Sequence, residues 1–314
     1  MKNYTTDKIR NLGLIGHGSE GKTTLTEAML FSAKAIDRLG RVEDGNTTTD
    51  YDPEELKRHI SITSAIAPLE WKQYKLNVID VPGYFDFIGE MASTLRVVDS
   101  ACIVVGAVSG VIVGTEKAWD YCHEYDIPKI IFVNQMDREN ANYTKVINQL
   151  TELYGTAIAP FQVPIMEGGQ FTGYVDVIAM KAYKFQGKDL VEIPVPADME
   201  AEIEPIRTTL IEAVAETSEE LMEKYFSGEE FSEGEIQAAL RDGVVSGDIV
   251  PVACGSAVNN QGVAPLMDLI ITYMPAPGEH GSVTGKNPHT QEVVERTYST
   301  SEPFSALCRK AFSL

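Results

Sequence analysis

The stretch Gly16-His17-Gly18-Ser19-Glu20-Gly21-Lys22-Thr23 decides the fold of this chain. It fits the phosphate-loop pattern, in which a glycine and four further residues precede Gly-Lys-Thr. Glycines are needed because backbone N–H groups close on a phosphate oxyanion, and a Cβ would block that approach. Lys22 would then place a point charge between the outer phosphates, and the hydroxyl of Thr23 would ligate Mg²⁺.

The residues on either side of this loop have the pattern of a strand and of a helix. Ile9 to Ile15 is mostly apolar and predicts a strand, whereas Thr24 to Ala35 carries apolar residues at helical spacing. A strand, a loop and a helix in that order are the setting in which this pattern binds phosphate. The alternative is a glycine-rich turn that only caps a helix.

Composition and charge limit the class of protein. With 314 residues, 44% of them hydrophobic, the chain can form two domains or one domain with a large insertion. The formal net charge of −20 does not suit broad contact with a nucleic-acid backbone, so we expect no DNA partner. No run approaches the ~20 apolar residues of a membrane helix, and Met1 to Arg10 has no signal-peptide core. We therefore expect a cytoplasmic protein with no membrane partner.

The cysteines and histidines do not form a metal-binding pattern. The four cysteines are scattered without a Cys-x-x-Cys pair, and the five histidines lack the spacing of metal ligands. We interpret the cysteines as small buried hydrophobic residues in a reducing cytoplasm.

The order of strand and helix patterns predicts an α/β fold, with a mostly parallel sheet covered by helices on both faces. We expect this domain to occupy residues 1–156 and to resume at residues 249–277. Short strand patterns and an acidic helical block predict an inserted α+β subdomain at residues 157–248. The acidic block is either a solvated helix face or a docking surface for a basic partner. Residues 278–314 read as a linker followed by the start of a strand, Phe304 to Phe312.

A polar stretch from Asp37 to Ile62 follows the first helix. Its Gly, Thr, Asp and Arg content predicts a mobile loop, and loops of this length are usually functional or disordered. Ser61 or Thr63 could supply a second hydroxyl to Mg²⁺, so that the loop orders when a γ-phosphate is present and relaxes when it is lost. The alternative is that Ser61 is an ordinary loop residue.

Asp80-Val81-Pro82-Gly83 comes directly after an apolar run, Leu76 to Ile79. At the end of a strand, the Asp80 carboxylate would hold Mg²⁺ through a water, and the Gly83 N–H would meet a γ-phosphate oxygen. The Asp-x-x-Gly pattern also occurs in ordinary turns. It gains weight here because a phosphate loop lies upstream.

Asn134-Gln135-Met136-Asp137 lies at the end of another apolar run and fits a guanine-reading element. A carboxylate at Asp137 can accept from both N1–H and the exocyclic amine of guanine, and leaving those donors unpaired would penalise the wrong base. Asn134 would brace this loop. Gly255-Ser256-Ala257 would bring a backbone N–H, that of Ala257, to the guanine carbonyl.

With these elements in order, the chain resembles the elongation factor G family of translational GTPases over nearly its whole length. Beyond the phosphate loop, the matching stretches are Glu43-Asp44-Gly45, Arg58-His59-Ile60-Ser61-Ile62-Thr63, Asp80-Val81-Pro82-Gly83-Tyr84-Phe85-Asp86-Phe87, Phe132-Val133-Asn134-Gln135-Met136-Asp137-Arg138, Ser218-Glu219-Glu220-Leu221-Met222-Glu223-Lys224-Tyr225, Cys254-Gly255-Ser256-Ala257 and Glu302-Pro303-Phe304-Ser305-Ala306-Leu307. The resemblance implies a P-loop NTPase that binds GTP or GDP with Mg²⁺, hydrolyses GTP and acts at the ribosome. It also implies that residues 278–314 begin a β-barrel second domain. The chain would then be a fragment, which we expect to be monomeric.

Several positions depart from the family's pattern. Tyr84 stands where the family has the histidine that positions the attacking water, and a phenol does not gain and lose a proton near pH 7 as an imidazole does. Ser61 replaces the magnesium threonine but keeps its hydroxyl, and Gln135 replaces the lysine beneath the base. Ser19 and Glu20 stand where the family usually has Asp-Ala. These changes resemble a paralogue branch rather than the housekeeping factor.

The motifs and the resemblance together assign three sets of residues. The nucleotide contacts are His17, Gly18, Ser19, Glu20, Gly21, Lys22, Thr23, Thr24, Asp80, Gly83, Asn134, Gln135, Asp137, Ser256 and Ala257. The metal ligands are Thr23, Ser61 and Asp80. The catalytic positions are Tyr84, Lys22 and Gly83.

Three functional hypotheses follow from the sequence. The first is a GTP-hydrolysing switch that acts with the ribosome. The second is a GTP- and GDP-binding regulatory module with negligible hydrolysis, because Tyr84 replaces the usual histidine. The third is a nucleotide-binding protein of another class, such as an ATPase or a cofactor binder.

Overall fold

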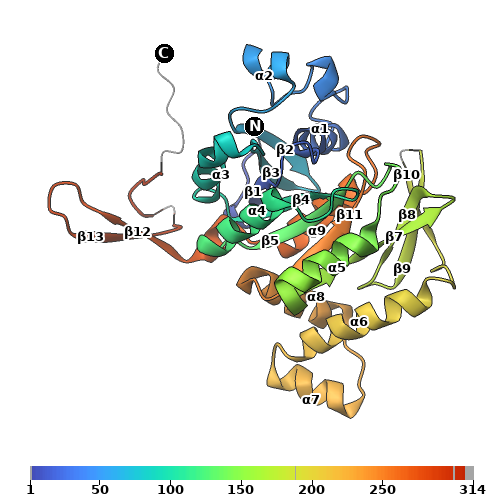
Figure 1. The fold of residues 1–314 in the computed structure, drawn as a ribbon. Helices are drawn as coiled ribbons and strands as arrows, with labels where there is room; N and C mark the ends of the chain where they lie inside the picture. The colour runs from blue at the N-terminus through green and yellow to red at the C-terminus, as the bar shows by residue number, and fades with distance from the viewer. Residues whose placement is uncertain (1, 188, 300, 308–314) are drawn as a thin grey trace.

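The computed structural model describes residues 2–187, 189–299 and 301–307. At its centre is a seven-stranded sheet with the strand order β2-β3-β1-β4-β5-β11-β6 (Figure 1). The strands are β1 (Ile9–Ile15), β2 (Ala65–Trp71), β3 (Tyr74–Asp80), β4 (Ser100–Gly106), β5 (Lys129–Asn134), β6 (Ile158–Pro160) and β11 (Val250–Cys254). β2 is antiparallel to β3, and every other neighbouring pair is parallel. The mostly parallel sheet expected from the sequence is confirmed.

Helices cover both faces of this sheet. They are α1 (Lys22–Ser32), α3 (Ile88–Leu95), α4 (Val113–Glu124), α5 (Tyr143–Tyr154) and α9 (Val263–Tyr273). Alternate residues of a strand point to opposite faces, so Val104 of β4 joins one buried cluster and Val105 joins the other. The first cluster includes side chains of α1 and α9, and the second includes those of α3, α4 and α5. Because both faces are covered, the central strands are continuous apolar runs.

The chain between residues 157 and 248 is built mainly from a second sheet and three helices. The sheet is antiparallel, with the order β10-β9-β8-β7. The elements are β7 (Gln162–Glu167), β8 (Gln170–Asp176), β9 (Lys181–Gln186), β10 (Asp189–Ile193), α6 (Glu200–Ala215), α7 (Glu219–Ser227) and α8 (Glu233–Ser246). β6, at the start of this segment, belongs to the main sheet, and Val163, Leu210 and Val244 share the buried cluster of α1 and α9. None of the residues of α7 is buried, and α7 lies beyond α6 at the edge of the molecule (Figure 1).

The polar stretch from Asp37 to Ile62 is more regular than the mobile loop that we expected. It contains a 3-10 turn, Val42–Asp44, and a helix, α2 (Pro53–Arg58). Six residues are too few for helical periodicity to show in a sequence. The helix is fixed instead by a capping box between Asp52 and Glu55.

Near the C-terminal end, β12 (Ser282–Lys286) and β13 (Val293–Thr297) form a hairpin, which projects from the body of the protein (Figure 1). The strand expected from Phe304 to Phe312 is not formed at residues 304–307, and its other residues lie outside the described part of the chain. Among the residues that the structure describes, no helix has the length and apolar content that spanning a bilayer requires.

Candidate functional site

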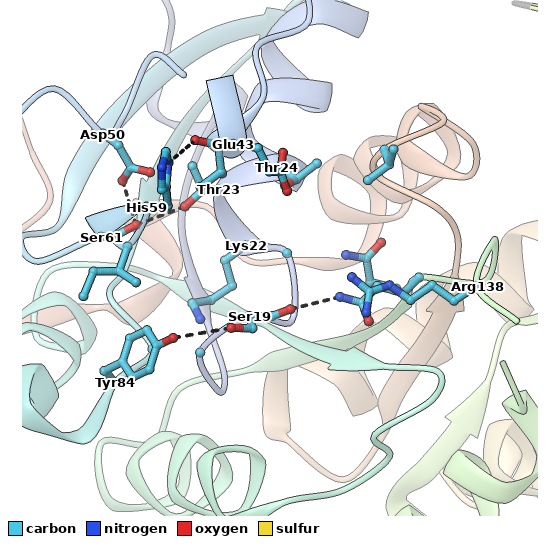
Figure 2. A pocket seen from close by; sticks show the side chains of 18 of the residues that line it. Ser19, Lys22, Thr23, Thr24, Glu43, Asp50, His59, Ser61, Tyr84 and Arg138 are labelled. Atoms are coloured by element: carbon cyan, nitrogen blue, oxygen red, sulfur yellow. Dashed lines mark hydrogen bonds between the residues drawn. The ribbon is translucent and has the colours of Figure 1, made fainter. Parts of the chain in front are cut away.

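The candidate site lies at the edge of the main sheet where its parallel strands end. The loops that follow β1, β3, β5 and β11 meet there, at the usual position of ligand sites in such sheets. They surround a cavity of about 270 Å³ (Figure 2). The predicted residues that line this cavity are Gly18, Ser19, Gly21, Lys22, Thr23, Thr24, Ser61, Gly83, Tyr84, Asn134, Gln135 and Asp137.

The loop between β1 and α1 encloses the side chain of Lys22. Gly21 has a φ of +87°, and a Cβ there would lie 2.5 Å from Asn134 Nδ2, so this position requires glycine. The Lys22 ammonium donates to the backbone carbonyls of Gly16 (3.1 Å) and His17 (2.6 Å). Burial lowers the pKa of Lys22 to about 8. A buried cation at the positive end of α1 is well placed to attract an anion.

Gly83 and Tyr84 close over this loop from the end of β3. A Cβ at Gly83 would lie 2.2 Å from Lys22 Nζ and 2.6 Å from the Gly18 nitrogen, so the Gly83 backbone lies directly against the loop. The Tyr84 ring covers Gly18, where a Cβ would be 3.1 Å from the ring. The Tyr84 hydroxyl lies 3.4 Å from Ser19 Oγ (Figure 2). Both residues therefore lie beside Lys22, at the position where the outer phosphate of a nucleotide is expected.

Hydroxyl groups from two segments meet at the start of α1. Thr23 Oγ1 lies 3.1 Å from Ser61 Oγ, and the Ser61 hydroxyl donates to Asp50 Oδ1 at 2.7 Å (Figure 2). Thr63, the alternative to Ser61, does not line the cavity, and its backbone N–H donates to Glu55. Of the two hydroxyls considered for this loop, Ser61 is the one beside Thr23.

Asp80 is buried close to these hydroxyls. Its Oδ2 accepts from the Thr49 hydroxyl at 2.7 Å, whereas its Oδ1 is buried and has no hydrogen-bond partner among the described residues. Burial raises the pKa of Asp80 to about 6. A buried carboxylate oxygen without a partner is costly, and a divalent cation that prefers oxygen ligands would satisfy it. The donor set of Thr23, Ser61 and Asp80 therefore fits Mg²⁺.

Asn134 links the two loops on either side of the cavity. Its amide nitrogen donates to the Glu20 carbonyl at 2.9 Å, and its amide oxygen accepts from the Ala257 N–H at 3.0 Å. The Asn134 side chain is only 2% exposed, so this link is sealed from solvent. The Ala257 N–H that we expected to meet the guanine carbonyl thus donates to Asn134 in this structure. The next residue, Val258, lines the cavity instead.

Asp137 and Gln135 extend this arrangement along the loop after β5. The buried Ser256 hydroxyl donates a hydrogen bond to Asp137 Oδ1, which orients the carboxylate at the cavity wall. Gln135 Nε2 donates to the Ser19 carbonyl at 3.0 Å. An oriented carboxylate accepts hydrogen bonds only, so it can pair with two neighbouring N–H donors of a base.

Five predicted residues do not line the cavity: His17, Glu20, Asp80, Ser256 and Ala257. The His17 ring packs at 5.8 Å from that of Phe85, and its Nδ1 would be 2.5 Å from a Cβ at Gly114. The Glu20 carboxylate turns beneath the loop, where the Ser109 hydroxyl lies 3.0 and 2.9 Å from its two oxygens. These side chains hold the loop from beneath rather than face the cavity.

Other lining residues are not indicated by the sequence patterns: Val42, Glu43, Asp50, His59, Ile60, Arg138 and Val258. Most of them lie in the polar stretch after α1, where no strand or helix period indicates the direction of a side chain. Glu43, His59, Ile60 and Arg138 lie in stretches that match the elongation factor G family, and this signal could have found them. Adjacency to Ala257 could have found Val258.

The loop around Lys22, the carboxylate at the end of β3 and the braced loop after β5 define a P-loop nucleotide-binding domain. Residues 7–276 match the family described as Elongation factor Tu GTP binding domain. The chain therefore belongs to this family of translational GTPase G domains. A crystal structure of a protein from Thermus thermophilus is similar, with a TM-score of 0.84 and 37% sequence identity, and the match covers 89% of this chain. The chain spans 43% of the length of that Thermus protein.

Membership of this family decides between the classes of nucleotide. A domain of this type binds guanine nucleotides, so the hypothesis of an ATPase or of an unrelated cofactor binder is wrong. The prediction of a P-loop α/β fold is confirmed.

Proposed function

We propose that this chain is the G domain of an elongation factor G-like protein, that it binds GTP or GDP with Mg²⁺, and that it hydrolyses GTP as a conformational switch at the ribosome. The observation that carries the proposal is the meeting of distant segments at one cavity, which brings together Lys22, Ser61, Gly83 and Asp137. Phosphoryl transfer depends mainly on positioning and on charge stabilisation, and these segments supply both.

Phosphate binding is assigned to the loop and to Gly83. The Lys22 ammonium now donates to two neutral carbonyls, and a phosphate would offer it a charge-assisted and stronger acceptor. The Gly83 N–H belongs to the backbone that lies against Lys22, so Gly83 would meet the γ-phosphate while the Lys22 ammonium lies between the two outer phosphates. Bound Mg²⁺ would neutralise charge on the phosphate oxygens, and Thr23, Ser61 and Asp80 would hold it.

Tyr84 is the residue from which the attacking water would be oriented. Its hydroxyl reaches the rim of the loop beside Ser19, and the side chain keeps 38% of its surface exposed. A phenol both donates and accepts hydrogen bonds, so it can orient a water without removing a proton. Hydrolysis by this domain should therefore be slow without a partner.

Tyr84 is also the observation that favours the second function, a GTP- and GDP-binding regulator with negligible turnover. Its ring rests on Gly18 and its hydroxyl faces the Ser19 hydroxyl. The Tyr84 hydroxyl is then engaged by Ser19 rather than by an attacking water. In that case the domain would report which nucleotide is bound, and the same residues would bind it.

Release of phosphate from GTP, measured with and without ribosomes, separates these functions. We expect release by the wild-type chain to exceed that of Lys22→Ala, and a further increase when ribosomes are added. Binding of GTP without release above the Lys22→Ala control in both conditions would support the regulatory function. A failure of GTP to bind at all would overturn the proposal.

A further inference from the structure

We propose that Glu55 is the positioning residue for the metal-binding side of the cavity. Its carboxylate holds the backbone that follows Asp50 and the backbone that follows Ser61, and so it sets the distance between those two side chains. This inference rests on the proposed function, because it assigns the Ser61 hydroxyl a role toward Mg²⁺ and the γ-phosphate.

The Glu55 carboxylate is buried and accepts hydrogen bonds from both ends of one loop. Its Oε2 accepts from the backbone N–H groups of Tyr51 (3.2 Å) and Asp52 (3.1 Å). Its Oε1 accepts from those of Ile62 (2.9 Å) and Thr63 (3.0 Å). Glu55 is 1% exposed, so these bonds do not compete with solvent. A capping box accounts for the Asp52 bond, but it does not account for the bonds to Ile62 and Thr63.

The four N–H groups lie next to the side chains that face the cavity. Tyr51 directly follows Asp50, and Ile62 directly follows Ser61. Since a peptide unit is planar, holding the N–H of one residue also holds the carbonyl of the residue before it. Asp50 and Ser61 then meet at 2.7 Å, with Thr23 3.1 Å from the Ser61 hydroxyl (Figure 2). One carboxylate thus controls the placement of two cavity side chains.

The backbone carbonyl of Glu55 adds to this control. It accepts from the N–H of His59 and from that of Ile60 at 3.3 Å, which closes the turn at the end of α2. His59 takes a left-handed φ of +54° at this turn, a conformation that is uncommon for a non-glycine residue. His59 and Ile60 both line the cavity. Glu55 therefore fixes the path of the chain from Asp50 through Ser61.

A change of Glu55 to glutamine would disturb this arrangement specifically. Glutamine keeps the shape of the side chain, but its NH₂ group would face two of the four backbone donors. Those donors would be buried without an acceptor. The preceding residue, Glu54, offers a matched control because its exposed carboxylate pairs with the exposed side chains of Lys57 (3.8 Å) and Arg58 (3.0 Å). Exposed pairs of this kind contribute little.

The test measures affinity for a non-hydrolysable GTP analogue and for GDP across a range of Mg²⁺ concentrations, using the whole chain. For Glu55→Gln we expect the affinity for the GTP analogue to fall about tenfold and its Mg²⁺ requirement to rise, with GDP affinity unchanged. Glu54→Gln should match the wild type. Wild-type affinity for the GTP analogue in Glu55→Gln would overturn the inference, and so would an equal loss for both nucleotides.

A double variant tests the route through Ser61. If Glu55 acts by placing that hydroxyl, Glu55→Gln should cause little further loss in a Ser61→Ala background, whereas two independent losses would multiply and contradict the inference. Should Glu55→Gln fail to fold, hydrogen exchange of the wild-type chain decides instead. The amides of Ile62 and Thr63 should exchange slowly, and fast exchange would overturn the inference. A wild-type chain that does not bind the GTP analogue in Mg²⁺ would contradict the proposed function, whereas normal binding by the wild type and equal binding by Glu55→Gln would contradict this assignment alone.

Discussion

The two sides of the cavity are held together in different ways. On one side, the loops that follow β1, β5 and β11 are rooted in the sheet and are linked to one another by the enclosed side chain of Asn134. On the other side, the stretch from Asp37 to Ile62 is attached to the body through side-chain hydrogen bonds of buried carboxylates. Glu27 of α1 accepts from the N–H of Gly40 at 3.1 Å and from that of Thr48, and Asp80 accepts from the Thr49 hydroxyl at 2.7 Å. Within the stretch, Glu55 closes the loop by accepting from four further N–H groups.

This difference suits two separate tasks. Loops rooted in buried parallel strands have little freedom, so they can recognise the base and the inner phosphates with constant geometry. A polar segment attached by a few side-chain hydrogen bonds opens at low free energy, as segments that respond to ligands must. We infer that the sheet-rooted side identifies the nucleotide and that the carboxylate-attached side responds to its γ-phosphate.

The largest expected effect comes from breaking the sheet-rooted side at Asp137. In Asp137→Asn an amide donor would face the guanine donors, so GTP affinity should fall about 1000-fold while xanthosine triphosphate binds better. Competition against a fluorescent guanine nucleotide measures this. Glu139→Gln, an exposed carboxylate two residues away that does not line the cavity, is the control. Unchanged base preference in Asp137→Asn would remove Asp137 from the base-reading role.

The next largest effect is expected at Lys22, which lies at the start of α1, directly after the loop that follows β1, on the sheet-rooted side of the cavity. Lys22→Ala should weaken GTP and GDP alike by about 100-fold, because it removes a charge-assisted contact to phosphate. Equilibrium binding of both nucleotides measures this, with the exposed Lys145→Ala as control. A loss confined to GTP would instead place Lys22 with the γ-phosphate sensor.

A smaller effect, on rate rather than affinity, is expected at Tyr84. Tyr84→His should raise phosphate release about tenfold and leave GDP affinity unchanged, because an imidazole near its pKa can exchange a proton with water and a phenol cannot. The gain should shrink below about pH 6, where imidazole is protonated. Single-turnover release from pH 5.5 to 8 measures both effects. A Tyr84→Phe variant as fast as the wild type would show that the hydroxyl does not orient the water.

The last expected effect, at Asp80, concerns the stability of the nucleotide-free chain rather than binding or rate. Its folded-state pKa of about 6 lies above the ordinary value of about 4, so the folded nucleotide-free chain binds the extra proton. The protonated Asp80 carboxyl makes its full contribution to the free energy of unfolding below about pH 4. That contribution is lost as the pH rises through about 6, a change of up to about 3 kcal/mol. Asp80→Asn should therefore raise the melting temperature of the nucleotide-free chain by a few degrees at pH 7.5 and flatten its pH dependence. A melting temperature equal to or below the wild type would contradict this account.

The same division explains what the sequence could predict. Three site segments each follow an apolar run: residues 16–23, 80–83 and 134–137. The apolar runs indicate where the strands end, and the ends of parallel strands lie at one edge of the sheet. The enclosing helices follow from their 3.6-residue period. For this reason the sequence could predict the sheet-rooted side of the cavity.

The rest depends on contacts that no local period encodes. Asp50 lines the cavity from a loop whose two ends are both bonded to Glu55, and α2 is too short to show a helical pattern. The sequence could not decide between Ser61 and Thr63 as the residue beside Thr23, because that depends on which of the two side chains points toward the cavity. Likewise, nothing in a linear reading shows that the Ala257 N–H is engaged by Asn134.

The contact between Tyr84 and Gly18 has a consequence for how such a site can evolve. An added Cβ at position 18 would force the ring to shift by a few tenths of an ångström, and a branched side chain would displace it. A chain that keeps the phenol at position 84 in this place is therefore expected to keep a small residue at position 18. The two positions should change together among homologous sequences.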